Sequence, residues 1–357
     1  MSNLARFRQK LAELQIPALM VTDLANVKWL TGFTGTSGVA LVTQDQARFV
    51  TDSRYTLQAE EQVTEMPTHW FQSPVLIEEF LAQQVSEMGI TQLGFEAANV
   101  TYATFEKWQQ RFSGVELKGA PEVISLLRMV KSPDEIDKIR RACGVADACF
   151  DHVIRMIQPG VSEWDISLDI EFFIRRSGCE LAFDPIVVSG ERSARPHGKA
   201  SEKKLEIGDF VTMDFGARLD GYNSDITRTV VVGKPTDRHH EIYGQVLKAQ
   251  LATLDMMKPG VRAADVDGLA RQVFDEIGMA KYFGHGLGHG LGSVVHDTGR
   301  MSASSQDVLE VGQVWTVEPG LYVPGFGGVR IEDDVVITES GIENFTKAPK
   351  ELMSFPA

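Results

Sequence analysis

An internal repeat in the second half of the sequence is the feature that most constrains what this chain can fold into. The segment GDFVTMDFG at 208–216 aligns without gaps to GQVWTVEPG at 312–320. Each segment is typical of a glycine-bounded β-strand, and each carries a carboxylate near its end, Asp214 in the first and Glu318 in the second. Such a repeat predicts two copies of one structural unit related by a pseudo-two-fold axis.

A second pair of acidic residues extends the repeat. Asp225 follows the first segment and Glu332 follows the second, each on a further strand-like stretch. If a strand pair is duplicated, the four carboxylates meet around the pseudo-two-fold axis. Chance similarity between two glycine-bounded strands is the alternative, and the repeat alone leaves it open.

Three of the eight histidines fall close together in a glycine-rich part of the chain. His285, His289 and His296 lie in or shortly after the run GHGLGHGLG at 284–292. Glycine at this density disfavours the interior of a helix or strand and suits a backbone that approaches another group closely. A single histidine is usually structural, but this grouping is more typical of a metal ligand with acid–base neighbours.

The four carboxylates and the imidazole of His289 form a ligand set for two divalent cations. Such cations lie about 3.5–4 Å apart and convert a bridging water into a hydroxide nucleophile near neutral pH. Without thiolate and with little nitrogen, the set favours Mn²⁺, with Co²⁺ or Zn²⁺ as alternatives, over copper. A buried cluster of carboxylates without cations would repel itself. The sequence does not itself establish that these side chains converge.

The length of 357 residues predicts two domains. In the first third, strand-like runs alternate with helical pattern and turn glycines, which predicts an α/β domain over residues 1–125. Its expected strands cover 18–21, 39–42, 48–51 and 92–95, and its clearest helix covers 75–88.

A helix start marks the second domain, which we place at residues 126–357. Ser132 can cap this helix, Pro133 suits its first position, and Glu135 completes a capping box. A second capping pattern begins at Ser162. Long helices are expected over 133–157, 162–178, 237–257 and 263–277. Together with the repeated strands, they predict an α+β domain.

Composition excludes several classes of partner. A formal net charge of −14, from 49 acidic and 35 basic residues, would repel nucleic acid and anionic lipid. No apolar run is long enough for a membrane span or a signal peptide. The three cysteines form no CxxC pair, so we expect buried core residues, no disulfide framework and a cytoplasmic location. They are Cys143, Cys149 and Cys179.

These motifs together resemble the metallopeptidase family with the "pita-bread" fold, which includes methionine aminopeptidase, Xaa-Pro aminopeptidase and prolidase. The five ligand positions match in order, within MDFGA, SDITRT, GHG, TVEPG and VRIED. The first domain resembles the creatinase-type N-terminal domain in NVKWLTGF at 26–33, TDSRY at 51–55 and MVKSP at 129–133. The resemblance implies an α/β N-terminal domain followed by an α+β pita-bread catalytic domain with an internal pseudo-two-fold repeat.

The resemblance also implies roles for individual residues. Two divalent metal ions would be held by Asp214, Asp225, His289, Glu318 and Glu332. Glu318 would in addition act as general base toward the attacking water.

Three further histidines match residues that line the pocket in this family. His197 would lie beside the scissile bond, and His285 would shape the proline side of the pocket. His296 would donate a hydrogen bond to the carbonyl oxygen as it becomes an oxyanion.

Three arginines bear on substrate handling. Strand alternation puts Arg330 on the same face as Glu332, where it could orient the carboxylates; a solvated strand arginine is the alternative. Arg195 stands where many relatives carry a small apolar residue, and it would narrow the pocket, reach a substrate carboxylate or simply lie exposed. Arg300 resembles the prolidase arginine that grips the C-terminal carboxylate of a dipeptide.

By this resemblance the chain is expected to be an Xaa-Pro aminopeptidase, which removes the N-terminal residue that precedes proline. The alternatives are an Xaa-Pro dipeptidase (prolidase), a broader aminopeptidase that does not require proline, and a non-catalytic binding protein on the same fold. Creatinase lacks the metal ligands, so a creatinase-like amidinohydrolase is disfavoured. The expected partners are peptide substrates and a second copy in a homodimer, with neither nucleic acid nor membrane.

Overall fold

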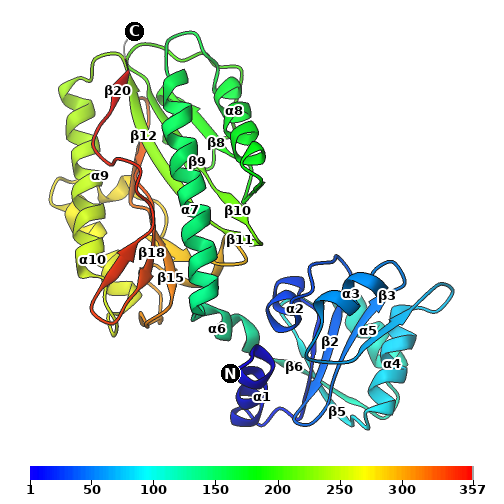
Figure 1. Cartoon of the computed structure of the whole chain (residues 1–357). Helices are drawn as coiled ribbons and strands as arrows, with labels where there is room; N and C mark the ends of the chain where they lie inside the picture. Colours follow the sequence, from blue (N-terminus) through cyan, green and yellow to red (C-terminus); the bar gives the residue numbers. More distant parts are fainter. Residues whose placement is uncertain (356–357) are drawn as a thin grey trace. The chain divides into compact units, whose positions relative to one another are not determined.

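The chain folds into two compact units. The computed structural model describes residues 1–355, and the chain divides into Met1–Arg128 and Met129–Ala357 (Figure 1). Helix α6 (Val123–Met129) spans the division, and the boundary expected after residue 125 falls inside this helix.

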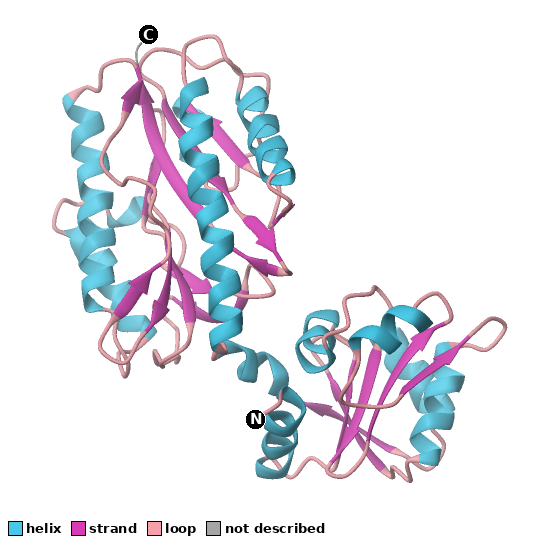
Figure 2. Cartoon of the chain, viewed as in Figure 1, coloured by secondary structure: helices cyan, strands magenta, loops and turns pink. Residues whose placement is uncertain are grey.

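The first unit is built on a six-stranded mixed sheet with helices packed against it (Figure 2). The strand order is β4 (Thr68–Phe71), β3 (Ala47–Asp52), β2 (Val39–Thr43), β1 (Ala18–Val21), β5 (Gln92–Glu96) and β6 (Glu116–Ala120). The helices are α1 (Asn3–Glu13), α2 (Leu24–Thr31), α3 (Thr56–Gln62), α4 (Ile77–Glu87) and α5 (Tyr102–Arg111). The expected α/β domain is therefore confirmed, with each expected strand present to within a residue at its ends.

Central strand β1 shows why these strands read as continuous apolar runs. Leu19 and Val21 enter one buried cluster, whereas Ala18 and Met20 enter a second cluster. Because successive side chains point to opposite faces of a sheet, the two clusters lie on its two faces. A strand covered on both faces has no polar side, which is the pattern seen here.

Within residues 129–355, the second unit contains four long helices and four sheets. The helices are α7 (Pro133–Val153), α8 (Glu163–Arg176), α9 (Asp237–Met256) and α10 (Ala263–Asp275), with short 3₁₀ turns η1 (Ile154–Met156), η2 (Gly190–Ala194) and η3 (Ala280–Tyr282). All four long helices were expected, and both capping boxes are formed, by Ser132 with Glu135 and by Ser162 with Asp165.

The strands of the second unit form two main sheets and two small ones. One main sheet has the order β20 (Ser354–Phe355), β12 (Ile226–Val232), β9 (Phe210–Phe215) and β8 (Ile186–Ser189). The other has the order β14 (Asp297–Met301), β13 (Gly288–Gly290), β15 (Val314–Val317), β18 (Asp333–Ile337) and β19 (Ile342–Asn344). The small sheets are β11 (Tyr222–Asn223), β10 (Ala217–Leu219) and β7 (Glu180–Leu181), and β16 (Gly320–Val323) with β17 (Gly327–Arg330).

The internal repeat is confirmed in the backbone hydrogen bonds of this unit. The amide of Gly160 donates to the carbonyl of Leu205 at 2.9 Å, and the amide of Gly260 donates to the carbonyl of Leu309 at 2.8 Å. Strands β9 and β12 pair antiparallel, as do β15 and β18. In the first copy α7 and α8 pack on β9 and β12, and in the second α9 and α10 pack on β15 and β18.

The cysteines occupy the core as expected. Cys143, Cys149 and Cys179 are buried and free. Burial raises the pKa of Cys149 to about 12, so this thiol stays protonated at neutral pH. Across residues 1–355, no helix combines the length and apolar character needed to cross a membrane.

The two copies of the repeat are joined through Arg228 on β12. Its guanidinium donates to the carbonyl of Glu332 at 2.6 Å and to the carboxylate of Asp333 at 2.8 Å, and all three residues are buried. Further bonds run to the carbonyls of Thr227, Ala348 and Pro349. Although burial opposes the charge of Asp333, Arg228 and Lys350 lower its pKa below its ordinary value.

Replacing Arg228 by methionine should lower the free energy of unfolding by about 3–5 kcal/mol, because it leaves a buried carboxylate with one cation fewer and several carbonyls unpaired. Urea denaturation measures the change. The matched control is Arg175→Met, which breaks an exposed pair with Glu171 and should change stability by no more than about 0.5 kcal/mol. Equal effects of the two changes would contradict the prediction.

Candidate active site

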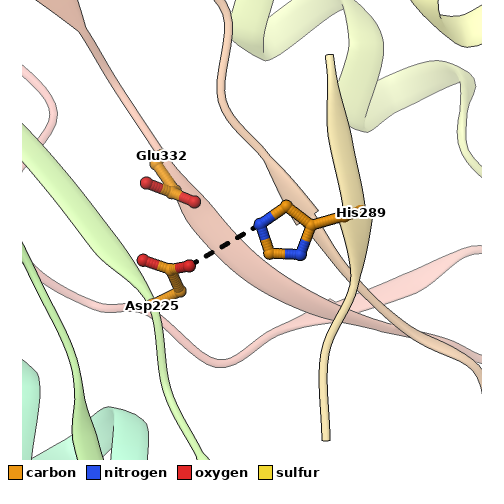
Figure 3. Close-up of side chains that lie close together, drawn as sticks. All are labelled: Asp225, His289 and Glu332. Atoms are coloured by element: carbon orange, nitrogen blue, oxygen red, sulfur yellow. Dashed lines mark ion pairs between the residues drawn. The ribbon is translucent and has the colours of Figure 1, made fainter. Parts of the chain in front are cut away.

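Five side chains expected to bind metal come from both copies of the repeat. Asp214 lies on β9 and Asp225 directly before β12; Glu318 directly follows β15 and Glu332 directly precedes β18, while His289 lies on β13. Ligand atoms of Asp225, His289 and Glu332 all lie within 4.8 Å of one another. Figure 3 shows these three side chains pointing toward one shared space. The convergence that the sequence could not establish is present in the fold.

The imidazole of His289 is oriented by its own backbone. Its Nδ1 lies 3.0 Å from the carbonyl of Gly290, which can only accept, so Nδ1 carries the hydrogen. Its Nε2 lies 3.7 Å from Asp225 Oδ2 and 3.6 Å from Glu318 Oε1. Burial lowers the pKa of His289 to about 4, so the ring is neutral. A lone pair therefore faces two carboxylates, and a cation between them would satisfy all three groups.

Burial and neighbouring negative charges both disfavour the ionised form of these carboxylates. Burial, followed by the charge of Glu332, raises the pKa values of Asp225 and Glu318 well above their ordinary range. Burial and the charge of Asp214 raise the pKa of Glu332 to about 8. Within residues 1–355, Oδ1 of Asp214 is buried without a hydrogen-bond partner. Hard oxygen donors, one imidazole and an unsatisfied buried oxygen fit divalent cations.

Arg330 lies beside the carboxylates, but not by alternation along one strand as expected, because Arg330 ends β17 and Glu332 directly precedes β18 in another sheet. Its Nη2 donates to Asp214 Oδ2 at 2.5 Å and its Nε donates to the hydroxyl of Thr227 at 2.9 Å. That hydroxyl donates in turn to Glu332 Oε2 at 2.5 Å. Arg330 thus fixes one carboxylate directly and a second through Thr227, and its position is buried rather than solvated.

Tyr322 is a site residue that the sequence analysis missed. Its buried hydroxyl accepts from Arg330 Nη1 at 2.8 Å and lies 2.8 Å from Nε2 of His285. Since Nδ1 of His285 faces the carbonyl of Gly286 at 2.7 Å, Nε2 accepts and the tyrosine donates. No sequence motif indicates Tyr322, because its partners Arg330 and His285 lie 8 and 37 residues away on other elements.

The remaining histidines surround this cluster. The rings of His289 and His296 meet edge to face with centroids 4.4 Å apart. Burial and the charge of Arg330 together lower the pKa of His285 to about 4. Burial and the charge of Arg300 lower the pKa of His296. His197 is exposed on the loop that follows η2, and the neighbouring carbonyl of Pro196 accepts from Arg330 Nη1 at 3.3 Å.

Two of the predicted arginines lie at the surface. Arg300 is opposite His289 in the pairing of β13 and β14, and its Nη1 donates to the carbonyls of Asp297 and Gly299 at 2.6 and 2.8 Å. These bonds hold a cation next to the imidazoles. Arg195 is exposed at the end of η2, and its side chain forms no hydrogen bond or ion pair with any described residue.

The glycines around His289 are required by close backbone packing. A Cβ on Gly288 would lie 2.1 Å from the carbonyl oxygen of Thr316, and one on Gly290 would lie 2.0 Å from that of Thr298. The interpretation of the glycine-rich run as a close backbone approach is therefore confirmed. Larger side chains would push β13 away from its neighbours and carry the imidazole with it.

Comparisons with known proteins agree with the motif analysis. The sequence matches the family described as "Metallopeptidase family M24" over residues 137–339 and the "Creatinase/Prolidase N-terminal domain" over residues 3–130. An uncharacterized peptidase of Bacillus subtilis (strain 168) is 44% identical over 353 residues, which cover 98% of this chain and 99% of the relative.

Solved structures show the same two-domain architecture. An Xaa-Pro dipeptidase from Bacillus anthracis has a TM-score of 0.95 at 43% identity and covers 99% of each chain. An X-Pro aminopeptidase from Thermotoga maritima has a TM-score of 0.90 at 34% identity, covering 97% of this chain and all of the other. The family and the fold expected from the motifs are thereby confirmed.

The metal-free protein should lose thermal stability as pH rises from 6.5 to 8. Glu332 binds its proton more tightly when folded, so stability falls between its ordinary pKa of 4.5 and its folded value of about 8. His285 and His289 act in the opposite direction, but only below their ordinary value of 6.5. Melting of chelator-treated protein measures the slope, which Glu332→Gln should reduce; stability that rises over this range would contradict the assignment.

Removal of the His289 imidazole should release metal. After dialysis, His289→Ala is expected to retain at most about one divalent ion per chain where the unaltered protein retains two, as measured by atomic emission. His285→Ala is the matched control, because its ring bonds to Tyr322 rather than to the carboxylates and its loss should leave the metal content unchanged. Full occupancy in His289→Ala would refute its role as a ligand.

Proposed function

Since this chain belongs to metallopeptidase family M24, we propose that it is an Xaa-Pro dipeptidase that depends on two divalent metal ions. The convergence of Asp225, His289 and Glu332, with the ring of His296 against that of His289, carries this proposal. The sequence motifs favour an Xaa-Pro aminopeptidase, but the similarity to an Xaa-Pro dipeptidase over nearly the whole chain favours the dipeptidase. The aminopeptidase becomes the second candidate, which the Thermotoga maritima structure supports.

The candidate ligands are the five acidic and imidazole side chains at the meeting of the two repeat copies. Asp214, Asp225, His289, Glu318 and Glu332 would hold two cations, for which we propose Mn²⁺ ahead of Co²⁺ or Zn²⁺. Bound cations of this kind lower the pKa of a shared water and polarise a carbonyl oxygen. Arg330 would keep Asp214 in its ligating orientation through their hydrogen bond.

Glu318 is suited to act as the general base. Its Oε1 lies 3.6 Å from Nε2 of His289, among the candidate ligands where an attacking water would be bound. It would take the proton from the attacking water and deliver it to the proline nitrogen, which becomes the leaving amine. Proline offers no N–H donor, so the pocket must recognise the ring by shape.

The aromatic side chains near His285 suit a proline ring. The rings of Phe283 and His285 meet edge to face with centroids 5.0 Å apart, and the rings of His285 and Tyr322 lie with centroids 5.4 Å apart. His296, beside His289, would donate a hydrogen bond to the carbonyl oxygen as negative charge develops. His197 would lie beside the scissile bond.

Arg300 is the feature that distinguishes the two candidates. Its guanidinium is held next to the imidazoles of His289 and His296 by two backbone carbonyls. A fixed cation there would pair with the C-terminal carboxylate of a dipeptide. A longer peptide has an uncharged peptide bond at that position and would gain nothing from the arginine. Asp225 would contact the free amino terminus in either case.

Assembly and location complete the proposal. The buried, free cysteines fit a reducing cytoplasm. A homodimer stays the expected state of the protein, and sedimentation at micromolar concentration tests it.

The exposed Arg195, next to Pro196 at the pocket, is the residue that would broaden specificity beyond proline if it entered the site.

Product analysis by mass spectrometry tests the function. Metal-stripped protein reconstituted with Mn²⁺ is given Ala-Pro, Ala-Pro-Ala and Met-Ala-Ala together. We expect loss of Ala-Pro alone, because only a dipeptide places its carboxylate at the arginine. Release of alanine from Ala-Pro-Ala would establish the aminopeptidase instead, and cleavage of Met-Ala-Ala would show that proline is not required. Stoichiometric metal binding with no hydrolysis would indicate a non-catalytic binding protein.

Arg300→Ala should raise KM for Ala-Pro by about tenfold or more, since a charge-assisted hydrogen bond to a carboxylate is worth about 1.5–3 kcal/mol. Hydrolysis of Ala-Pro amide, which lacks the carboxylate, is the internal control and should be equally slow in both proteins. Steady-state kinetics measure both. An unchanged KM for Ala-Pro would remove Arg300 from the substrate site.

A further inference from the structure

Glu163, the first residue of α8, is fully buried and accepts hydrogen bonds on both carboxylate oxygens. Oε1 accepts from the amide and hydroxyl of Ser189 at 2.7 and 2.9 Å. Oε2 accepts from the amide and hydroxyl of Ser201 at 3.1 and 2.7 Å. Nε of Arg192 lies within 3.2 Å of both oxygens. The side chain has 0% exposure, so this charge is satisfied entirely by the protein.

These bonds close a loop that carries one of the pocket histidines. Residues 189–201, here called the histidine loop, begin and end at the two serines bound to Glu163 and contain His197. Within the loop, Arg192 Nη2 donates to the carbonyl of Lys199 at 2.7 Å. One buried carboxylate on a helix therefore fixes both ends of the loop and, through Arg192, its interior.

The tip of the histidine loop reaches the candidate active site. The carbonyl of Pro196 accepts from Arg330 Nη1 at 3.3 Å, next to the carboxylates. His197 itself is exposed, so core packing does not fix its ring. Its position depends on the backbone of the loop. Glu163 holds the two ends of that backbone, and bonds from the amide of Gly328 to Ser193 Oγ and from Arg330 to the carbonyl of Pro196 hold its middle.

We propose that Glu163 is a positioning residue that sets His197 beside the scissile bond by holding both ends of the histidine loop. The inference rests on the proposed peptidase function, because it assigns Glu163 a role in that reaction through His197. Such anchoring matters to the reaction rate, because displacement of a catalytic group by about 1 Å can lower the rate about a hundredfold.

The first variant keeps the shape of the side chain. In Glu163→Gln, one accepting oxygen becomes an NH₂ group that must face either the Ser189 donors or the Ser201 donors. One end of the loop then loses its anchor. We expect kcat/KM for Ala-Pro to fall about 10–100-fold with unchanged metal content. A loss of metal would place the effect at the ligand cluster and overturn the inference.

A double-mutant cycle with His197→Ala separates positioning from general stability. If Glu163 acts through His197, Glu163→Gln should slow the His197→Ala enzyme by less than about twofold, although both changes can lower the melting temperature independently. Multiplicative losses in kcat/KM would overturn the inference. Ser201→Ala removes one donor from one end and provides a milder variant, for which we expect a severalfold loss that also vanishes in the His197→Ala background.

A matched control lies on the same turn of α8. Asp165→Asn removes a carboxylate that caps the helix through Ser162 and does not touch the histidine loop. We expect it to lower the melting temperature while leaving kcat/KM within about twofold of the unaltered protein. A large loss of activity in this control would show that any weakening of α8 suffices, and it would overturn the specific role of Glu163.

Limited proteolysis provides a readout without activity. Trypsin does not cleave the Arg195–Pro196 bond, so opening of the loop exposes cleavage after Arg192 and Lys199. Mass spectrometry should find these cuts several-fold faster in Glu163→Gln than in Asp165→Asn. Equal rates would overturn the inference. Failure of the unaltered protein to hydrolyse any Xaa-Pro peptide would instead defeat the proposed function and with it the catalytic role of Glu163.

Discussion

Carboxylates buried side by side repel one another, and the groups next to them in the second unit offset this repulsion. Burial raises the pKa values of Asp225, Glu318 and Glu332, each of which faces at least one other acid. Arg330 offsets part of the repulsion, and the neutral imidazole of His289 adds a donor without adding charge. A bound cation would offset the remainder, so that metal binding and local stability would be two aspects of one interaction.

The duplicated fold brings these groups together. Each copy supplies two carboxylates at equivalent places on an antiparallel strand pair, and the copies meet where Thr227 bridges to Glu332. What surrounds the ligands is not duplicated. Glu163 holds the histidine loop of the first copy, whereas Asp267 on α10 holds the backbone before His289 by accepting from the amide of Leu287 at 3.0 Å. Outside the candidate ligands, the two copies therefore anchor the neighbouring backbone by different residues.

Most of the backbone structure could be predicted from the sequence. The repeat, the capping boxes and the glycine-rich run predicted the strand pairs, the long helices and the close approach at Gly288 and Gly290, because those signals are local. Tyr322 and Glu163 escaped notice, since their importance lies in partners distant along the chain. Arg228 was passed over for the same reason. Hydrogen bonds over such separations leave no pattern in one sequence, and Arg300 is the one residue by which the motifs bear on the choice between dipeptide and longer substrates.

The meeting of the two copies has a consequence for how such a protein could have arisen. Asp214 and Asp225 belong to one copy, and Glu318 and Glu332 belong to the other. A chain with a single copy would hold half of the carboxylates and could assemble the full set only by association with a second identical chain. Gene duplication and fusion would then have made a self-paired ancestor permanent, and afterwards each half was free to acquire residues that the other lacks.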